Sequence, residues 1–141
     1  MSQQNVEKLR AAYEAFNRGD FDGFVRYMDP EIEVHPGVMA PDAARQYLGR
    51  QAVRNFLVNI VGGPWEAVTA EPQEIIETED GRVLSVDRWR FRGRDGIEVE
   101  RELPNLYTFR EGLILRIDGF TDRAEALDAA GLSEKDAHTD S

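Results

Sequence analysis

One short segment of the sequence combines a single carboxylate with aromatic residues and a regular run of charges. Residues 86–102, VDRWRFRGRDGIEVERE, contain five arginines, and Asp87 shares the alternating phase of Trp89 and Phe91. A carboxylate held among apolar side chains costs free energy unless it is paired or reaches water in a cavity. Such a group can act as a general base or a hydrogen-bond acceptor. Asp87 is therefore the first candidate catalytic residue.

The turn of this predicted hairpin decides which side chains share a face. A three-residue loop, RDG, with Gly96 in the left-handed conformation, joins the two strands. In this register one face carries three charge pairs: Arg92 with Glu98, Arg90 with Glu100, and Arg88 with Glu102. The other face carries Phe91 with Val99, Trp89 with Arg101, Asp87 with Leu103, Ser85 with Asn105, and Val83 with Tyr107. Each exposed charge pair contributes roughly 0.2–1 kcal/mol.

Asp87 and Arg101 fall on the apolar face, diagonal to each other, and two interpretations follow. In the first they form a buried structural ion pair, or a bend in the sheet takes both to solvent. In the second they line a ligand pocket, where Arg101 and burial set the protonation state of Asp87. The residues alone leave both interpretations open.

A second acid–base candidate ends the strand predicted at residues 31–36. His35 stands beside Pro36 and an irregular loop, and an imidazole exchanges protons near neutral pH. Glu33 has the same phase and either orients His35 or faces solvent. The structural alternative is that His35 only anchors the loop with a hydrogen bond. The candidate ligand contacts are Tyr13, Trp65, Trp89, Arg101, Leu103, Tyr107 and Asp118. Helical spacing alone makes Tyr13 a core residue, and Trp65 is either a pocket rim or a plug under a loop.

The elements that must position these residues change type halfway along the chain. Apolar residues at three- and four-residue steps predict three helices before residue 64, the second of them capped by Asp20. From residue 65 the period becomes two. Strands are predicted at 65–79, 82–93, 97–109 and 113–120, with a closing helix within 121–132. Helices followed by a run of strands indicate an α+β fold, with helices packed on one face of an antiparallel sheet.

The composition argues against several classes of function. With 141 residues, one domain is expected. A net charge of −10 disfavours nucleic acids and anionic membranes as partners. The sequence has no cysteine and two histidines, His138 lying in the polar tail, so no disulfide, thiol nucleophile or metal site is predicted. No apolar signal segment or membrane span is recognised, which predicts a cytoplasmic protein.

Four stretches of the sequence resemble the SnoaL-like polyketide cyclase group of the nuclear transport factor 2-like superfamily. They are YEAFNRGDFDGFVRYMDPEIEVHP, the Gly49-Arg50 start of the third helix, FREGLILRIDGF, and DRAEALDAAGL. The resemblance spans about residues 6–132. It implies a single domain over residues 1–132, followed by a polar, disordered tail at 133–141. The implied fold is a cone-shaped α+β barrel: a curved antiparallel or mixed sheet around three N-terminal helices, with a short C-terminal helix and an apolar pocket. It also implies a homodimer and no cofactor.

The resemblance carries ketosteroid isomerase roles to single positions. His35 stands where that enzyme has its catalytic Asp, and an imidazole can serve as the base. Asn105 matches the oxyanion-binding Asp, and its amide can donate a hydrogen bond to an enolate. The helix-borne Tyr of the same site falls on Ala12 or, with one gap, on Tyr13.

The epoxide hydrolase pattern is broken. Its Arg-x-Asp falls on Asp87 and Trp89, and its last-strand Asp falls on Gly119. Asp118, the candidate for the late base of the SnoaL cyclases, is one residue away. A shift of one residue points a strand side chain to the opposite face.

Two function classes remain from the sequence, and a third is weaker. The first is a cofactor-independent isomerase, cyclase or dehydratase acting on a hydrophobic, carbonyl-bearing or polycyclic small molecule. His35 and Asp87 would be its acid and base, with Asn105 and Tyr107 as oxyanion donors. The second is a non-catalytic ligand-binding or dimeric assembly module with the same fold. The third is a protein-docking module, for which no peptide groove is specified. The sequence does not decide whether loop 36–48 closes over the pocket.

Overall fold

The computed structural model describes residues 2–37, 46–63 and 65–133. The helices in this part are α1 (Ser2–Asn17), α2 (Phe21–Arg26), α3 (Arg50–Gly62) and α4 (Arg123–Ala129). The strands are β1 (Met28–His35), β2 (Tyr47–Leu48), β3 (Trp65–Glu77), β4 (Val83–Gly93), β5 (Glu98–Arg110) and β6 (Leu113–Gly119). Residues 134–141 of the predicted tail and 38–45 of the predicted loop lie outside the described residues, so the tail and a lid stay predictions.

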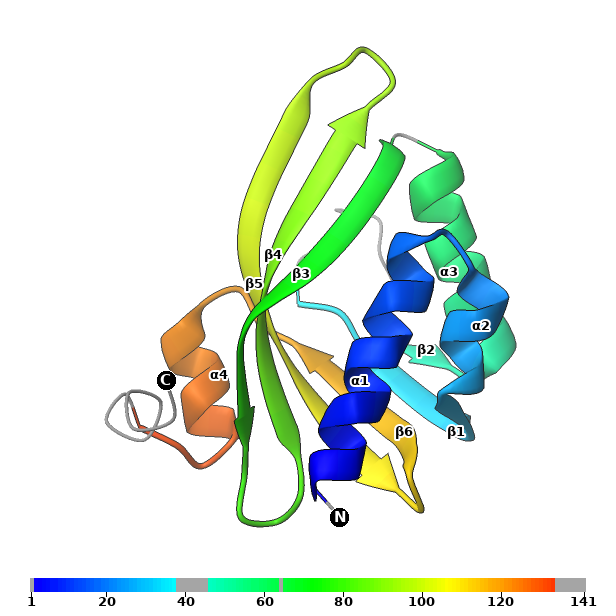
Figure 1. The fold of residues 1–141 in the computed structure, drawn as a ribbon. Coiled ribbons are helices and arrows are strands. Elements are labelled where there is room, and N and C mark those ends of the chain that lie inside the picture. Colours follow the sequence, from blue (N-terminus) through cyan, green and yellow to red (C-terminus); the bar gives the residue numbers. More distant parts are fainter. Residues whose placement is uncertain (1, 38–45, 64, 134–141) are drawn as a thin grey trace.

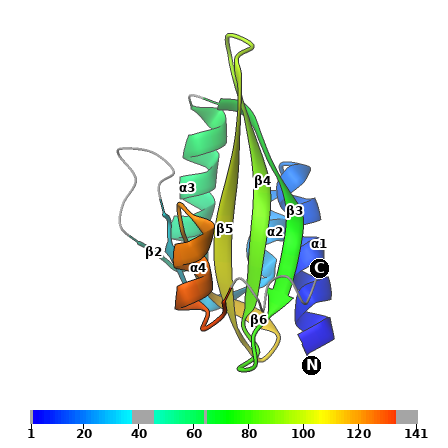
Figure 2. The ribbon, with the colours of Figure 1, turned by 90° about the vertical axis from the view of Figure 1, so that its left-hand side faces the viewer.

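The six strands form one mixed sheet. Their order is β2-β1-β6-β5-β4-β3, with β1 and β6 parallel and the other neighbours antiparallel. The sheet is strongly twisted and does not close (Figure 1). Helices α1, α2 and α3 cover one face, and α4 lies on the other (Figure 1, Figure 2). The predicted α+β class is confirmed, although the sheet keeps two free edges.

The start of the sheet differs from the prediction in two places. The predicted N-cap of helix α2 is confirmed, because the side chain of Asp20 accepts a hydrogen bond from the backbone N–H of Gly23 at 2.9 Å. The two differences concern the end of this helix and strand β2. Helix α2 ends at Arg26, because Met28 pairs with Ile114 of β6, and this backbone pairing replaces the last predicted helical turn. Strand β2 was not predicted; it pairs with β1 inside the segment that reads as an irregular loop.

The register predicted for the hairpin is confirmed pair by pair along β4 and β5. Gly96 has φ 87°, which is the left-handed conformation that the turn requires. Of the three predicted ion pairs, Arg90 with Glu100 is confirmed, whereas Arg88 and Arg92 take other partners. Arg88 and Arg90 both approach Glu100, at 3.8 and 3.6 Å, while Arg92 turns to Glu66 of β3 at 3.5 Å. Long exposed side chains can reach diagonal neighbours, so a correct backbone register does not fix the ion pairs.

Two hydrophobic cores lie on opposite sides of the sheet. The larger one fills the space between the sheet and helices α1–α3. A smaller one lies under α4, where Ala126 and Leu127 are buried with Leu84 and Leu106. Strand β4 is therefore buried on both faces at this end, and the charged outer face predicted for the hairpin is limited to the end near its turn.

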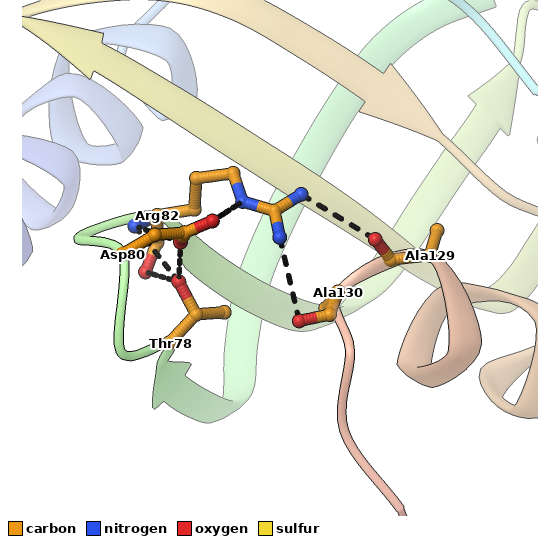
Figure 3. A network of polar contacts seen from close by, with 5 residues as sticks. All are labelled: Thr78, Asp80, Arg82, Ala129 and Ala130. Atoms are coloured by element: carbon orange, nitrogen blue, oxygen red, sulfur yellow. Dashed lines mark hydrogen bonds and ion pairs between the residues drawn. The ribbon is translucent and has the colours of Figure 1, made fainter.

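A polar network fastens α4 to the turn between β3 and β4 (Figure 3). The guanidinium of Arg82 donates to the carbonyl oxygens of Ala129 and Ala130, each at 3.4 Å, at the end of the helix. Such carbonyls have no partner within their own helix. Asp80 accepts from Arg82 and Thr78, and these hydrogen bonds lower the pKa of Asp80 to about 2. None of the helices in the described ranges is long and apolar enough to cross a membrane.

Candidate active site in the helix-covered cavity

Five polar side chains meet on the helix-covered face of the sheet. Ser85 and Asp87 come from β4, and Asn105 and Tyr107 come from the neighbouring strand β5. Alternation along each strand points all four to the same face. Tyr13 reaches them from α1, where it belongs to the apolar stripe that faces the sheet. We call these five residues the Asp87 cluster.

The carboxyl group of Asp87 accepts three hydrogen bonds. Ser85 Oγ donates to Oδ1 at 2.5 Å, and Tyr13 Oη donates to Oδ2 at 2.5 Å. Asn105 Nδ2 also donates to Oδ2, at 3.3 Å. The hydroxyls of Tyr13 and Tyr107 lie 2.5 Å apart and form a hydrogen bond in which either can be the donor. The two phenols and the carboxyl group thus form one continuous chain.

The cluster is largely buried, and among the described residues no cationic side chain contacts it. Asp87 and Ser85 are both 0% exposed, and Tyr13 and Tyr107 are 5% and 4% exposed. Burial raises the pKa of Asp87 above its ordinary 3.8, against the three hydrogen bonds, which favour the carboxylate. Burial also raises the pKa of both phenols well above 10.0, helped by the nearby charge of Asp87. As the pH rises, the carboxyl group of Asp87 is therefore the member of this chain that loses its proton first, while both phenols stay neutral.

The cluster forms the polar end of a cavity on the helix-covered face of the sheet. Tyr13, Asn105 and Tyr107 line this cavity, while Asp87 lies behind them. The other lining residues are mostly apolar: Phe16, Phe24, Met28, Val34, His35, Pro36, Gly37, Val53, Phe56, Leu57, Trp89, Leu103, Ile117, Gly119 and Phe120. A mostly apolar cavity with a few converging polar groups is typical of a small-molecule site.

His35 lines the same cavity from the end of strand β1, which lies between β2 and β6 in the sheet. Its Nε2 lies 3.2 Å from Glu33 Oε1, so the carboxylate can hold the ring in one orientation. When Nε2 carries the hydrogen, Nδ1 of the neutral ring can accept a proton. Strands β6 and β5 separate β1 from β4, and three strand spacings amount to about 14 Å along the sheet. His35 on β1 and the Asp87 cluster on β4 and β5 thus lie at different places along the sheet.

The structure places three of the candidate site residues elsewhere. Arg101 is exposed, and within residues 2–37, 46–63 and 65–133 no ion pair or hydrogen bond joins it to Asp87. The predicted role of Arg101 in setting the protonation of Asp87 is therefore wrong; burial sets it. Asp118 points to the outer face, where it accepts from Arg116 at 2.9 Å, because Ile117 and Gly119 take the inward phase. Trp65 contacts Phe91, with ring centroids 5.2 Å apart, and is not among the lining residues.

Two contributions to the site were missed by the sequence analysis. Ser85 was placed on the inward face opposite Asn105 but was given no role; its phase, two residues before Asp87, was the available signal. Trp89 was named as a ligand contact, but its indole N–H could not be foreseen as free. Trp89 Nε1 is the one buried side-chain nitrogen or oxygen in the described residues that lacks a hydrogen-bond partner.

Across those same residues, no group of three or more His, Cys, Asp or Glu side chains could hold a metal ion.

Glycines bring the end of β6 close to the end of β1. A methyl group at Gly119 would lie 2.7 Å from the backbone N of Gly37 and 3.2 Å from Asn105 Oδ1. Both glycines line the cavity beside His35. The absence of a side chain at Gly119 therefore leaves room for Asn105 to face the cavity.

The chain belongs to the SnoaL-like domain family, whose model matches residues 9–117. No curated protein matches the sequence. Among solved structures, TerC co-crystallised with polyporic acid is 25% identical, with TM-score 0.75 over 90% of this chain and 97% of that one. SalBIII, described as an epoxide hydrolase/cyclase-like enzyme in pyran ring formation, is 21% identical, with TM-score 0.72 over 88% and 96%. RV0760c from Mycobacterium tuberculosis, in complex with estradiol-17beta-hemisuccinate, is 14% identical, with TM-score 0.70 over 84% and 94%.

These similarities agree with the fold expected from the sequence. Another neighbour, from Catenulispora acidiphila, is described as having a ketosteroid isomerase-like fold and has TM-score 0.70. Several of these neighbours were crystallised with small molecules. Identities below 25% show the fold and leave the reaction to be argued from the site.

Proposed function

We propose that this protein binds a largely apolar small molecule with a carbonyl or hydroxyl group, and that it catalyses a cofactor-independent isomerisation, cyclisation or dehydration. The observation that carries the proposal is Asp87, a fully buried carboxyl group joined by hydrogen bonds to groups that line a cavity. In the part of the chain that the structure describes, it has no cationic partner. A titratable group with its pKa perturbed by burial beside such a cavity is typical of an active site.

The proposed roles divide between the two ends of the cavity. The ligand oxygen lies at the polar end, where Asn105 and Tyr107 hydrogen-bond to it, while the apolar walls hold the rest of the molecule. His35 acts as the base or acid at a ligand carbon. The distance between β1 and β4 supports this division, because one ligand can lie between His35 and the polar end. Tyr13, Trp89 and Leu103 complete the ligand contacts.

The ligands of two similar structures support a cyclic organic molecule as the ligand of this protein. The neighbour co-crystallised with polyporic acid reaches 25% identity over almost its whole length. A second neighbour was solved with an estradiol hemisuccinate. Neither ligand is assigned to this protein; together they support a search among cyclic compounds with oxygen substituents.

The second candidate is a non-catalytic carrier with the same cavity. It is favoured by the position of Asp87 behind Tyr13 and Asn105, which keeps the carboxyl group from touching a ligand directly. A carrier would bind the same compounds without converting them. The expected homodimer and the cytoplasmic location remain predictions, and sedimentation of the purified protein measures the first.

Binding and turnover are tested in sequence. A thermal-shift screen uses cyclic ketones and phenols against the wild type and against Val34→Trp, which fills the cavity from its partly exposed wall. Val58→Trp is the matched control, since Val58 is 40% exposed and does not line the cavity. Stabilisation of the wild type and the control, but not of Val34→Trp, locates binding in the cavity. Each compound that binds is then incubated with the protein and analysed by mass spectrometry and NMR for conversion. Conversion that is lost in Asp87→Asn and kept in Arg101→Gln supports the enzyme. If no bound compound is converted, the carrier is supported.

A further inference from the structure

The order of the protons along Asp87, Tyr13 and Tyr107 follows from counting hydrogens. A phenol has one hydrogen to donate, and its oxygen can also accept. When Asp87 is a carboxylate, Tyr13 donates its hydrogen to Oδ2 at 2.5 Å. The 2.5 Å contact between the two phenols must then use the hydrogen of Tyr107. In this state Tyr107 has only lone pairs left for the cavity that it lines.

Protonation of Asp87 reverses this order. The carboxyl hydrogen on Oδ2 is donated to Tyr13, Tyr13 donates to Tyr107, and the hydrogen of Tyr107 becomes free for the cavity. Ser85 at Oδ1 and Asn105 at Oδ2 hold the carboxyl group in the same position in both states. The positions of the heavy atoms therefore allow both proton orders without rearrangement.

We infer that Asp87, Tyr13 and Tyr107 form a proton relay, in which the state of Asp87 decides whether Tyr107 offers the ligand a donor or an acceptor. The inference rests on the proposed function and specifies the chemistry of its ligand. The ligand oxygen is one that changes between acceptor and donor during the reaction, as a ketone oxygen does when an enol forms. Tyr107 is then the catalytic residue at that oxygen, and Tyr13 and Asp87 act through it.

The relay balances in atoms and charge. His35 takes the proton from the carbon next to the carbonyl, and the C–H electron pair forms the C=C bond of the enol. Tyr107 gives its hydrogen to the carbonyl oxygen, Tyr13 gives its hydrogen to Tyr107, and Asp87 gives its carboxyl hydrogen to Tyr13. The phenols end neutral, His35 ends as an imidazolium, and Asp87 ends as a carboxylate. Return of the proton from His35 to a second carbon, with the relay running backwards, completes an isomerisation.

The surroundings of Asp87 suit a group that changes charge without changing partners. Tyr13 faces it from α1, Ser85 from β4, and Asn105 and Tyr107 from β5. On the β3 side its partner in the register is Pro72, which does not titrate. His35, in the same cavity wall, is the remaining titratable lining residue apart from the phenols.

The test uses the unliganded full-length protein with carbon-13 at tyrosine Cζ and aspartate Cγ, titrated by NMR. We expect the Asp87 signal to titrate above the ordinary carboxyl range. Tyr13 and Tyr107 should show a small step at the same midpoint, far smaller than the shift of a full phenol ionisation. In Asp87→Asn both tyrosine steps should vanish, and in Tyr13→Phe the step of Tyr107 should vanish while Asp87 still titrates. Tyr27, which is outside the cluster, should show no step at that midpoint.

Two results overturn the relay: tyrosine signals that stay flat while Asp87 titrates, or a Tyr107 step that persists in Tyr13→Phe. If Asp87→Asn does not fold, the wild type and Tyr13→Phe decide between these outcomes. Because no ligand is used, a negative binding screen leaves this test unaffected. If the protein binds cyclic ketones but its tyrosine signals stay flat, the proposed binding site is supported and the relay is overturned.

Discussion

The hydroxyl of Tyr13 on α1 donates a 2.5 Å hydrogen bond to the carboxyl group of Asp87 on β4, and the two residues are 74 positions apart in the sequence. This bond ties the first helix to the centre of the sheet. It also gives a buried acid a neutral partner where a cation is more usual.

Asp87→Asn is expected to remove a pH dependence of stability. Because the folded state raises the pKa of Asp87, the folded protein binds this proton more tightly than the unfolded chain. The contribution is fully present below the ordinary value of 3.8 and is lost as the pH rises through the folded-state pKa. Over that interval the wild type should lose stability relative to Asp87→Asn, by at most about 1.4 kcal/mol per pH unit. Urea unfolding at a series of pH values measures it, and parallel curves for the two proteins contradict it.

Tyr13→Phe is expected to lower the free energy of unfolding by about 1–3 kcal/mol, because it leaves a buried carboxyl oxygen and a buried phenol each one partner short. Tyr27→Phe is the control, since the Tyr27 ring is only half-buried and lies outside the cluster. Chemical denaturation of both variants tests the difference. Equal losses would mean that the hydrogen bonds to Tyr13 contribute nothing specific.

Gly119→Ala is expected to destabilise the protein by about 1–3 kcal/mol and to weaken ligand binding. The added methyl group would press on the backbone of Gly37 and on Asn105 at the cavity wall. Gly62→Ala is the control: it lies in α3 with no atom within 4 Å of the new methyl group, and should be neutral or stabilising by up to about 1 kcal/mol. Thermal unfolding with and without a ligand from the screen measures both effects; a neutral Gly119→Ala would show that the strand ends can separate.

Arg82→Ala is expected to loosen α4 without disturbing the cavity. The variant loses the hydrogen bonds to the last carbonyls of the helix and the partner of Asp80, for a cost of about 1 kcal/mol. Backbone amides of α4 should exchange hydrogen faster, while those of α1 keep their rates. Arg88→Ala, at an exposed and distant ion pair, should leave α4 unchanged. Unaltered exchange in α4 of Arg82→Ala would show that the apolar contacts alone hold the helix.

The parts of the fold that could be predicted are those governed by local pattern. Three pairs of opposite charges, placed symmetrically along the chain on either side of the turn at Gly96, predict the register of β4 and β5. This register correctly places Asn105 and Tyr107 on the same face as Asp87. The predicted contact of Arg101 with Asp87 was wrong, because a side chain on the inward face near the hairpin end of β5 can still reach water. The phase of Arg101 along the strand does not indicate how far the helices extend over the sheet.

The missing parts depend on long-range packing. The stripe on α1 makes Tyr13 inward-facing, but where the helix docks along β4 is set by the whole core, so its bond to Asp87 has no signature in the sequence. The same holds for α4: its capping by Asp122 is a local feature, whereas its place on the outer face of the sheet depends on Leu84 and Leu106. Asp118 was expected to contact the ligand and instead lies on the outer face, although strand alternation, with Ile117 and Gly119 facing inward, was a local signal for this outward phase.

The lack of a cation beside Asp87 also bears on how this scaffold can change during evolution. Where a buried acid is held by a buried base, loss of either residue strands the other charge, and both must change together. Here the neighbours of Asp87 are a serine, an amide and a phenol, and none of them carries a charge that its loss would leave behind. Under the proposed function, a single substitution at Asp87 would abolish proton transfer and leave a folded protein with its cavity. Enzyme and carrier would then be separated by one mutational step, which fits a fold that hosts many different activities.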